Sequence, residues 1–410
     1  MLTTWLSFKC LLICLNLLLQ RRDPLTLVQR YKSSSVIPVY LLYFILRSSF
    51  DLNGALAIST FNDWGEFQQV KFFQTQEIYA SVDGSLLVKP MDDVEFHAIS
   101  DLIVKFVNVS DTNYVRKIPD VADKTTILSF ARMAASAYVR DPTAENWIDI
   151  GGNWNRSKGI GWDSDGIRGH IFVEPMRAAA VIALKGTTTL ISSEDSDTYE
   201  RDRINDNLLF SCCCGRSNVL QDPVCDCYES TYTCSQSCLE NELASEDKYY
   251  RSALAIYHYV LSLYPEASIW VTGHSLAASL GSLIAQSTGR AAVTFCAPGE
   301  KLAASRLHLP SKFHPNSGDY IWHFGNTADP IFMGTCNGPL SPCYLAGYSM
   351  ETQCHSGREC IYDTVHDKDY SMSLIYHQIE SFIDIIEEYD SVAPCFESVN
   401  CLDCYLWDYE

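Results

Sequence analysis

Residues 268–287 read Ser-Ile-Trp-Val-Thr-Gly-His-Ser-Leu-Ala-Ala-Ser-Leu-Gly-Ser-Leu-Ile-Ala-Gln-Ser. The short apolar run at 269–272 is rich in residues that favour strands, so it predicts a buried strand. The small and apolar residues from 276 to 286 indicate a buried helix. Between these two segments, Gly273 to Ala277 predicts a sharp turn with Ser275 at its apex. The stretch therefore predicts an α/β fold organised around Ser275.

The predicted turn has a chemical purpose, because it lifts the serine oxygen out of the sheet. The helix behind it supplies backbone N–H groups and a positive dipole end where an oxyanion develops. Strand, turn and helix in this order form the nucleophile elbow of α/β-hydrolases. The last position of the usual G-x-S-x-G is Ala277 here, and one methyl group should still fit between strand and helix. An ordinary turn before a helix is the alternative interpretation, and the flanking strand and helix favour catalysis.

The composition limits the classes of function. A chain of 410 residues with 47% apolar residues can form one large domain with appendages, or two domains. The net charge of −20 argues against nucleic-acid binding, which needs a basic face. We predict no cofactor and no bound metal.

Cysteine usage points to an oxidising compartment. Of 17 cysteines, two lie in an apolar N-terminal run, and the others fall between Cys212 and Cys404. Their spacing is irregular, which favours disulfides over the paired C-x2-C pattern of zinc sites. The sequons at Asn108 and Asn155 predict glycosylation in the same lumenal setting. The lumenal cysteines are odd in number, and Cys296 lies in an apolar strand, so we predict that it is a free buried thiol.

The N-terminal region, residues 1–60, is predicted to lie outside the catalytic fold. It contains apolar runs at 5–19 and 36–46, separated by basic residues. The first run could span a bilayer, and the second resembles a signal segment with a cleavage site near 55–57. A buried pair of helices is the third interpretation. The positive-inside rule would place everything after residue 46 in a lumen.

Beyond this region the apolar patterns predict further strands and helices. Predicted helices cover 124–140 and 249–264, with a last helix opening near residue 374 and running to about 389. Predicted strands cover 167–173, 178–184, 291–296 and 320–324. Residues 191–240 form a cysteine-rich insertion that could cover the site as a lid.

An activated serine needs a base, and the base needs an acid that orients it. In α/β-hydrolases the chain order is serine, acid, histidine. Asp329 is the preferred acid because it follows a predicted strand, where α/β sheets place functional groups. The acids that remain open as alternatives are Asp363, Asp367 and Asp369.

The base is chosen from the histidines that follow Ser275. His377 is preferred because it lies beyond the last predicted strand and opens the last helix. His366 is the second choice. The hydroxyl-bearing loop Lys185-Gly186-Thr187 after the strand at 178–184 is placed where the other half of an oxyanion hole is built, although an ordinary turn is the alternative.

These motifs resemble a known family. Gly273-His274-Ser275-Leu276, the Lys185-Gly186-Thr187 strand end and the Asp329-Pro330 pair look like the class 3 lipase family. Longer strings closely resemble the fungal autophagy-related vacuolar lipases, at residues 204–214, 231–234, 297–304, 306–310 and 323–337. The resemblance covers residues 118–392. It implies an α/β-hydrolase fold of the class 3 lipase type, with the cysteine-rich insertion and an N-terminal membrane segment.

The resemblance also implies roles for single residues. Ser275 would be the nucleophile, Asp329 the acid and His377 the base, with Thr187 and the Leu276 N–H as oxyanion donors. The domains implied are an anchor or signal region at 1–60, a lumenal extension at 61–117, the lipase domain at 118–392 and a cysteine-containing tail at 393–410.

The implied activity is that of a lipase and phospholipase without a cofactor. Its partners would be phospholipids, neutral lipids and vesicle membranes, and not nucleic acid. A glycosylated type II membrane protein of this kind would pass through the endoplasmic reticulum, Golgi and multivesicular bodies to the vacuole lumen, and degrade autophagic bodies there. The alternatives are a secreted carboxylesterase or triacylglycerol lipase with the same triad, and an inactive membrane-anchored binding protein.

Overall fold

A computed structural model describes most of the chain after residue 113. The described ranges are 58–61, 67–71, 106–111, 114–151, 154–188, 196–215, 223–310, 320–397 and 400–410. Of the two compact units into which the chain divides, one (residues 1–58 and 71–89) lies almost wholly outside these ranges, so the description concerns the other. Residues 1–57 of the predicted anchor or signal region at 1–60, and the side chains of Asn108 and Asn155, also lie outside what is described.

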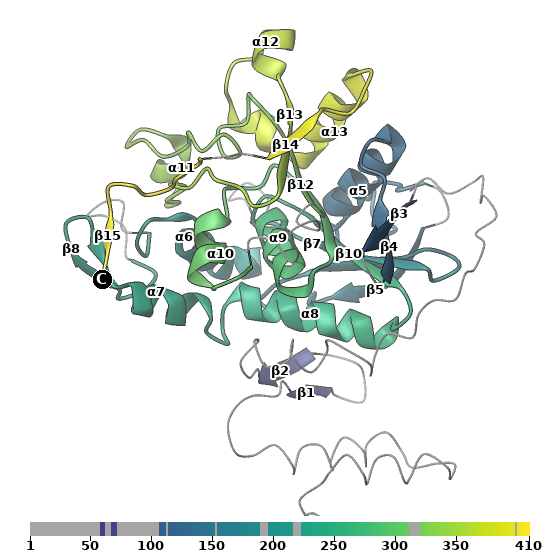
Figure 1. Cartoon of the computed structure of the whole chain (residues 1–410), viewed down its shortest axis with the longest axis horizontal. Helices are drawn as coiled ribbons and strands as arrows, with labels where there is room; N and C mark the ends of the chain where they lie inside the picture. Colours follow the sequence, from purple (N-terminus) through teal and green to yellow (C-terminus); the bar gives the residue numbers. More distant parts are fainter. Residues whose placement is uncertain are drawn as a thin grey trace, which may run out of the picture. The chain divides into compact units, whose positions relative to one another are not determined.

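An eight-stranded mixed sheet forms the centre of the domain (Figure 1), with the strand order β14-β13-β12-β11-β10-β7-β6-β5. Its strands are β5 (Asn155–Ile160), β6 (Gly169–Val173), β7 (Ala179–Leu184), β10 (Ser268–His274), β11 (Ala291–Phe295), β12 (Ile321–Asn326), β13 (Arg358–Tyr362) and β14 (Cys395–Glu397). Strands β7 to β13 in this sheet run parallel, and β5, β6 and β14 add antiparallel pairs at the two edges. The predicted α/β class is confirmed.

Helices cover both faces of this sheet. On one face α5 (Lys124–Ser136) and α13 (Ile379–Glu388) enclose an apolar core around Phe130, Trp270 and Phe382. On the other face α8 (Tyr249–Leu263) and α9 (Leu276–Thr288) enclose a second core. The central strands are therefore buried on both faces, which explains why they read as continuous apolar runs.

The other described elements are shorter. The helical ones are η1 (Ser196–Thr198), α6 (Tyr199–Phe210), α7 (Gln236–Leu243), α10 (Lys301–Arg306), α11 (Pro342–Leu345), α12 (Thr364–Lys368) and η2 (Leu374–His377). Strand β1 (Ile58–Phe61) pairs with β2 (Phe67–Lys71) in a two-stranded sheet, and β3 (Phe106–Asp111) pairs antiparallel with β4 (Tyr114–Pro119). No helix among the described ranges is long and apolar enough to cross a bilayer.

Seven disulfides crosslink the second half of the chain. They join Cys212–Cys404, Cys213–Cys234, Cys214–Cys225, Cys227–Cys238, Cys336–Cys343, Cys354–Cys401 and Cys360–Cys395. Within the described part of the chain Cys296 is the free cysteine and is buried, as predicted.

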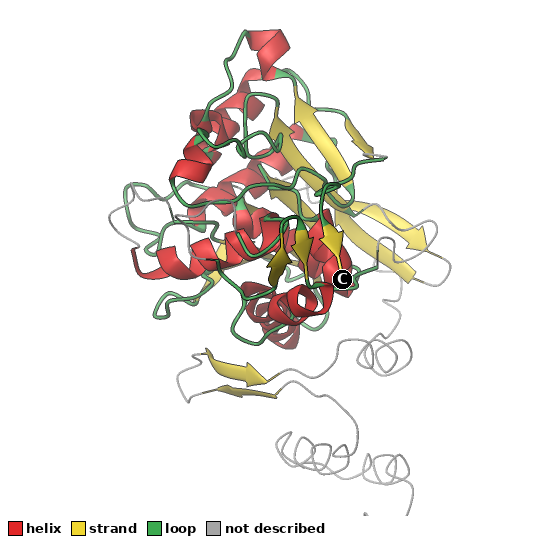
Figure 2. Cartoon of the chain, turned by 90° about the vertical axis from the view of Figure 1, so that its left-hand side faces the viewer, coloured by secondary structure: helices red, strands yellow, loops and turns green. Residues whose placement is uncertain are grey.

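The C-terminal tail is built into the fold. Strand β14 pairs with β13 at the edge of the main sheet. Strand β15 (Asp408–Tyr409) joins β8 (Tyr228–Ser230) and β9 (Thr233–Cys234) in a small three-stranded sheet that Figure 2 shows beside the C-terminus. The Cys212–Cys404 bridge makes the same connection covalent. The tail and the cysteine-rich insertion therefore form one crosslinked layer.

Candidate active site

Ser275 lies at the junction of β10 and α9, as the sequence predicts. Its backbone has φ 58° and ψ −127°, a strained conformation that side chains adopt rarely and that turns the chain sharply from strand to helix. The Ser275 N–H donates to the Phe295 carbonyl at 3.0 Å, which ties the turn to the neighbouring strand β11. The residue is 6% exposed. The serine is thus held at the carboxyl end of a central strand.

The three residues of the predicted triad meet in one hydrogen-bonded chain. His377 Nε2 lies 2.9 Å from Ser275 Oγ, although the two residues are 102 positions apart. His377 Nδ1 lies 2.8 Å from Asp329 Oδ2. Because the carboxylate can only accept, Nδ1 carries the proton and Nε2 is free to accept from the serine hydroxyl. This is the geometry in which an imidazole can act as a general base toward serine.

Asp329 is held in one orientation by its own backbone surroundings. It follows β12 and is completely buried. Its Oδ1 accepts the N–H of Ile331 at 2.8 Å and that of Phe332 at 3.3 Å, which leaves Oδ2 for His377. Backbone donors on one oxygen and a histidine on the other fix the direction of the carboxylate.

The segment that carries His377 differs from the predicted single helix. His377 closes the short helix η2, the next residue Gln378 is extended with φ −66° and ψ 136°, and only then does α13 begin at Ile379. The periodicity prediction was therefore wrong across this break. Tertiary contacts override it: the Asn326 side-chain amide donates to the Tyr376 carbonyl at 2.9 Å and holds the turn in place.

The alternative residues lie elsewhere. His366 is exposed on α12, and its ring contacts the carboxylate of Asp367 at 3.1 Å. Asp363 accepts the Thr327 hydroxyl and the His366 N–H, so it caps α12. Asp369 ends the same helix in a left-handed conformation. These side chains serve the exposed α12 turn and not the serine.

The two predicted oxyanion donors follow the adjacent strands β7 and β10: Thr187 lies in the loop after β7, and Leu276 begins the helix after β10. Strand β7 pairs with β10 so that Leu184 lies opposite Gly273, which brings the loop after β7 beside the elbow. Leu276 is the first residue of α9, where the N–H has no acceptor within the helix. The Thr187 hydroxyl donates to Asp206 Oδ2 at 2.7 Å. The assignment of Thr187 and Leu276 as oxyanion donors stays a prediction.

Helix α6 anchors this loop through buried polar groups that the sequence reasoning missed. The Thr188 N–H donates to Asp202 Oδ2 at 2.8 Å, and the Lys185 ammonium lies 3.6 Å from the same oxygen. Burial raises the pKa of Asp206 well above its usual range, so this carboxyl tends to stay protonated. The sequence signal for this arrangement was the spacing of Asp202 and Asp206, which are four residues apart and therefore lie on one face of a helix. Their polarity made the buried face of α6 look like solvent-exposed sequence.

Cys296 lies beside the triad. Its Sγ and the ring nitrogens of His274 and His377 are within 4.8 Å of one another, a distance at which such groups could hold a metal ion. However, each ring nitrogen of both histidines already has a hydrogen-bond partner. Burial first, and then the charge of Asp329, raises the pKa of the thiol, which disfavours the thiolate that a metal needs. The arrangement therefore suits a packed thiol better than a ligand.

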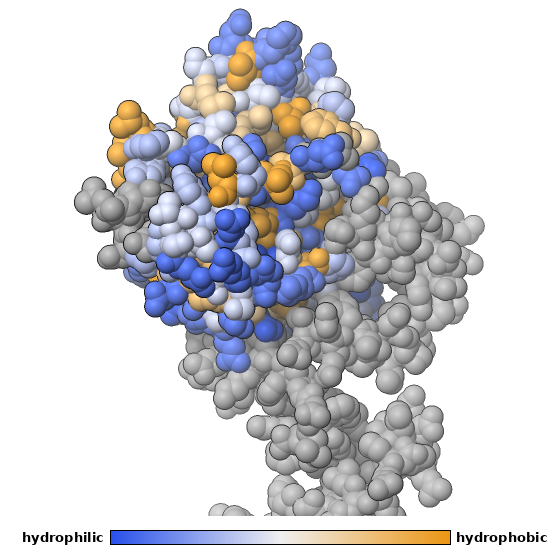
Figure 3. Space-filling view, turned by 60° about the vertical axis from the view of Figure 1, so that its left-hand side comes forward, coloured by the Kyte–Doolittle hydropathy of each residue, from blue (hydrophilic) through white to orange (hydrophobic). Residues whose placement is uncertain are grey.

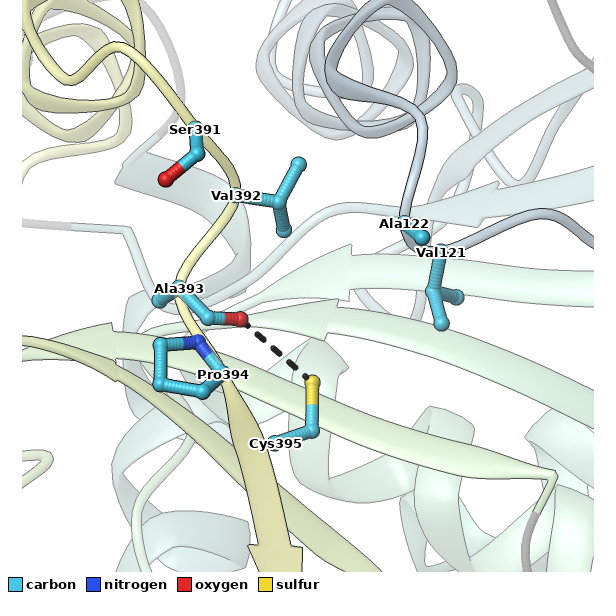
Figure 4. Close-up of a pocket in the computed structure, with 7 residues that line it drawn as sticks. All are labelled: Val121, Ala122, Ser391, Val392, Ala393, Pro394 and Cys395. Carbon is cyan, nitrogen blue, oxygen red and sulfur yellow. Dashed lines mark hydrogen bonds between the residues drawn. The ribbon is translucent and has the colours of Figure 1, made fainter.

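A surface pocket of about 260 Å³ lies away from the triad and does not belong to this site. Figure 4 shows its lining, in which Val121 and Ala122 face a short segment before β14. That segment consists of Ser391, Val392, Ala393 and Pro394, and Cys395, the first residue of β14, completes the lining. None of the proposed catalytic residues takes part.

Sequence comparisons relate this chain to known proteins. No protein-family model matches the sequence. A protein from Eremothecium gossypii named "Putative lipase ATG15" is 50% identical over 302 residues, which are 71% of this chain and 55% of that protein. A protein of the same name from Kluyveromyces lactis is 41% identical over 408 residues, covering 93% of this chain and 76% of the relative. The chain thus spans about half the length of the first of these relatives.

Solved structures resemble the chain more distantly. The Lip2 lipase from Yarrowia lipolytica is 17% identical with a TM-score of 0.32, covering 63% of this chain and 82% of that one. A Rhizomucor miehei lipase in complex with its propeptide is 14% identical with a TM-score of 0.31, covering 57% and 67%.

Proposed function

This chain belongs to the family of proteins named putative lipase ATG15, and on this premise we propose that it is a serine hydrolase that cleaves ester bonds of membrane lipids. The observation that carries the proposal is the hydrogen-bonded chain from Ser275 through His377 to Asp329.

In the proposed reaction the Ser275 hydroxyl attacks the ester carbonyl while His377 Nε2 takes its proton. The negative charge that develops on the carbonyl oxygen is stabilised by backbone N–H groups at the start of α9, foremost that of Leu276. His377 then returns the proton to the leaving alcohol, and an acyl-serine ester forms. Water, activated by the same histidine, releases the fatty acid and restores the serine. Asp329 stabilises the imidazolium in both steps.

A lipid substrate is supported by apolar side chains that border the catalytic histidine. Met372 and Ile375, a few residues before His377, are 49% and 54% exposed. The Thr335 hydroxyl contacts the Met372 sulfur at 3.0 Å, so the disulfide-closed loop at 336–343, with its exposed Leu340, lies nearby. In the face that Figure 3 shows, apolar groups stand out in separate places on a hydrophilic surface. Such side chains can insert between lipid headgroups.

We further propose that the enzyme acts on phospholipids and neutral lipids of vesicles such as autophagic bodies in the vacuole lumen. The N-terminal apolar runs would deliver it through the endoplasmic reticulum, Golgi and multivesicular bodies as a glycosylated type II membrane protein. The disulfide-rich layer supports an oxidising lumen. All proposed catalytic groups lie between Thr187 and His377, so release by proteolysis between residues 47 and 118 would leave the chemistry intact.

A serine-reactive fluorophosphonate tests the proposal. We expect the probe to label the oxidised protein at Ser275, with the site located by peptide mass spectrometry, and Ser275→Ala to remain unlabelled. Absence of labelling in the folded wild type would instead support an inactive binding protein. Hydrolysis of soluble short-chain esters without hydrolysis of phospholipid vesicles would support a secreted carboxylesterase.

A further inference from the structure

The imidazole of His274, the residue before the nucleophile, is buried and bridges two other groups. Its Nε2 lies 2.6 Å from the backbone carbonyl oxygen of His377, and its Nδ1 lies 2.8 Å from the Tyr138 hydroxyl. A carbonyl oxygen can only accept, so Nε2 must carry the proton and Nδ1 must accept from the tyrosine O–H. The two contacts together fix one tautomer of His274.

Tyr138 also contacts the loop that follows β7. The Gly186 N–H donates toward the Tyr138 oxygen. A Cβ on Gly186 would collide with the Tyr138 hydroxyl and with the His274 carbonyl oxygen, so the loop backbone passes directly against both residues. The tyrosine oxygen thus touches the predicted oxyanion loop on one side and the nucleophile strand on the other.

We propose that His274 and Tyr138 are positioning residues. They fix the position of His377 relative to Ser275, and they fix the position of the loop at Gly186 relative to these two residues. The inference rests on the hydrolase function proposed above. It adds a pair of residues that hold the backbone of the proposed base, His377, in place. Asp329 orients the His377 ring through Nδ1, whereas His274 holds the backbone from which that ring extends.

The backbone at His377 needs such support because it is not part of a regular helix. Gln378 is extended, and the turn before it depends on contacts from other elements. Asn326 holds the Tyr376 carbonyl, and the Ser373 N–H donates to the Ala328 carbonyl at 3.0 Å. His274 supplies the contact at the catalytic residue itself. A shift of about 1 Å in a reacting group can lower a rate about 100-fold.

The bridge should also hold in acid. Burial, followed by the nearby His377, lowers the pKa of His274 to about 3. The imidazole therefore remains neutral above that pH, and Nδ1 keeps the lone pair that accepts the Tyr138 proton. The hydrogen bonds of His274 then do not change at any pH above that value.

The test compares His274→Leu with His274→Gln in the full-length oxidised protein. Leucine fills a similar volume without a donor, whereas glutamine can place an N–H near the position of Nε2. We expect His274→Leu to lower kcat roughly 30- to 100-fold with little change in KM, and His274→Gln to recover much of that loss. Thermal melting serves as the folding control. Equal kcat in the two variants, or a loss carried by KM, would overturn the proposal.

Tyr138→Phe provides a second and gentler variant. It removes the hydroxyl that selects the His274 tautomer, so we expect kcat to fall about 3- to 10-fold. If the tyrosine acts through His274, the effect of His274→Leu must be smaller in the Tyr138→Phe background than in the wild type. Effects that multiply independently would contradict the proposed coupling.

Ser275→Ala distinguishes failure of the proposed hydrolase function from failure of the proposed positioning role of His274. If turnover survives in Ser275→Ala, the proposed function itself is wrong. If Ser275→Ala is inactive while a folded His274→Leu variant keeps full kcat, the hydrolase stands and only the positioning role fails.

Discussion

The methyl group of Ala277 lies directly opposite Gly273, so that a Cβ on Gly273 would be 2.8 Å from it and 2.7 Å from the Ala277 carbonyl carbon. Atoms that are not bonded do not approach so closely without displacement. The glycine of the elbow is therefore required by the close packing of β10 against α9, and Ala277 fits only because residue 273 has no side chain.

This relationship gives a matched pair of variants. Gly273→Ala should destabilise the protein by about 1–3 kcal/mol, since the turn must move to relieve the clash, and activity should fall with it. Ala277→Gly removes a methyl group and should cost about 1 kcal/mol or less while turnover is kept. Thermal melting and ester hydrolysis of both variants measure this. A fully active Gly273→Ala would contradict the packing argument.

The proposed triad predicts a large loss of activity when either Asp329 or His377 is replaced. Asp329→Asn and His377→Ala should each lower kcat by about 10⁴- to 10⁶-fold without unfolding the protein. His366→Ala is the matched control, because this exposed histidine contacts Asp367 and not the serine. Circular dichroism confirms folding in each case. If His366→Ala lost activity while His377→Ala kept it, the base would be assigned wrongly.

The disulfides should contribute unequally to stability. The Cys212–Cys404 bridge closes a sequence separation of 192 residues, and Cys336–Cys343 one of only 7. The loss of chain entropy in the unfolded state alone gives stabilisations of roughly 5 kcal/mol for Cys212–Cys404 and 2.5 kcal/mol for Cys336–Cys343. The other disulfides shorten the loop that Cys212–Cys404 closes, and so reduce its contribution. We expect the double variant Cys212→Ala, Cys404→Ala to lose more in urea unfolding than Cys336→Ala, Cys343→Ala. The reverse order would show that the tail is held mainly by other contacts.

A buried cluster predicts how stability depends on pH. Burial alone would raise the pKa of Glu300, but His323, His355 and the Ser282 hydroxyl lower it to about 2. Burial opposes the charge on His355, yet Glu359 and Glu300 raise its pKa above the usual 6.5. Asp403 also faces His355, and burial raises the pKa of that carboxyl.

The sign of each contribution follows from linkage. Glu300 stabilises the fold above its unfolded pKa near 4.5, and this is lost as the pH falls toward 2. His355 stabilises the fold below its unfolded pKa near 6.5, and this is lost as the pH rises through its raised folded value. Both contributions are complete only between about pH 4.5 and 6.5. In melting curves from pH 2 to 9, Glu300→Gln should flatten the acid side and His355→Gln the alkaline side. Unchanged slopes would show that the cluster does not titrate as inferred.

Much of the site could be predicted from sequence because its signals are local. The strand, glycine turn and small-residue helix around Ser275 are contiguous, and the carboxylate after β12 follows directly from the strand pattern. His377 was selected as the base from its position after Ser275 and beyond the last predicted strand. The break at Gln378 was not predicted, because the helical periodicity continues through it and only contacts from Asn326 and His274 reveal the turn.

Other features depend on contacts that no local pattern encodes. Tyr138 and Asp206 meet the site from distant parts of the chain, and their roles depend on tertiary packing. Disulfides could be predicted from cysteine spacing, but not which cysteines pair. That Cys212 bonds Cys404, and so joins the insertion to the tail, follows only from the folded structure.

The most direct test of the central claim is fatty-acid release from phospholipid vesicles by the purified, oxidised protein and by its Ser275→Ala variant, with vesicle binding measured in parallel. We predict that both proteins bind the vesicles and that only the wild type releases fatty acid. Equal release by the two proteins would show that Ser275 is not the nucleophile, and binding without release by the wild type would show that the chain is not an active lipase under these conditions.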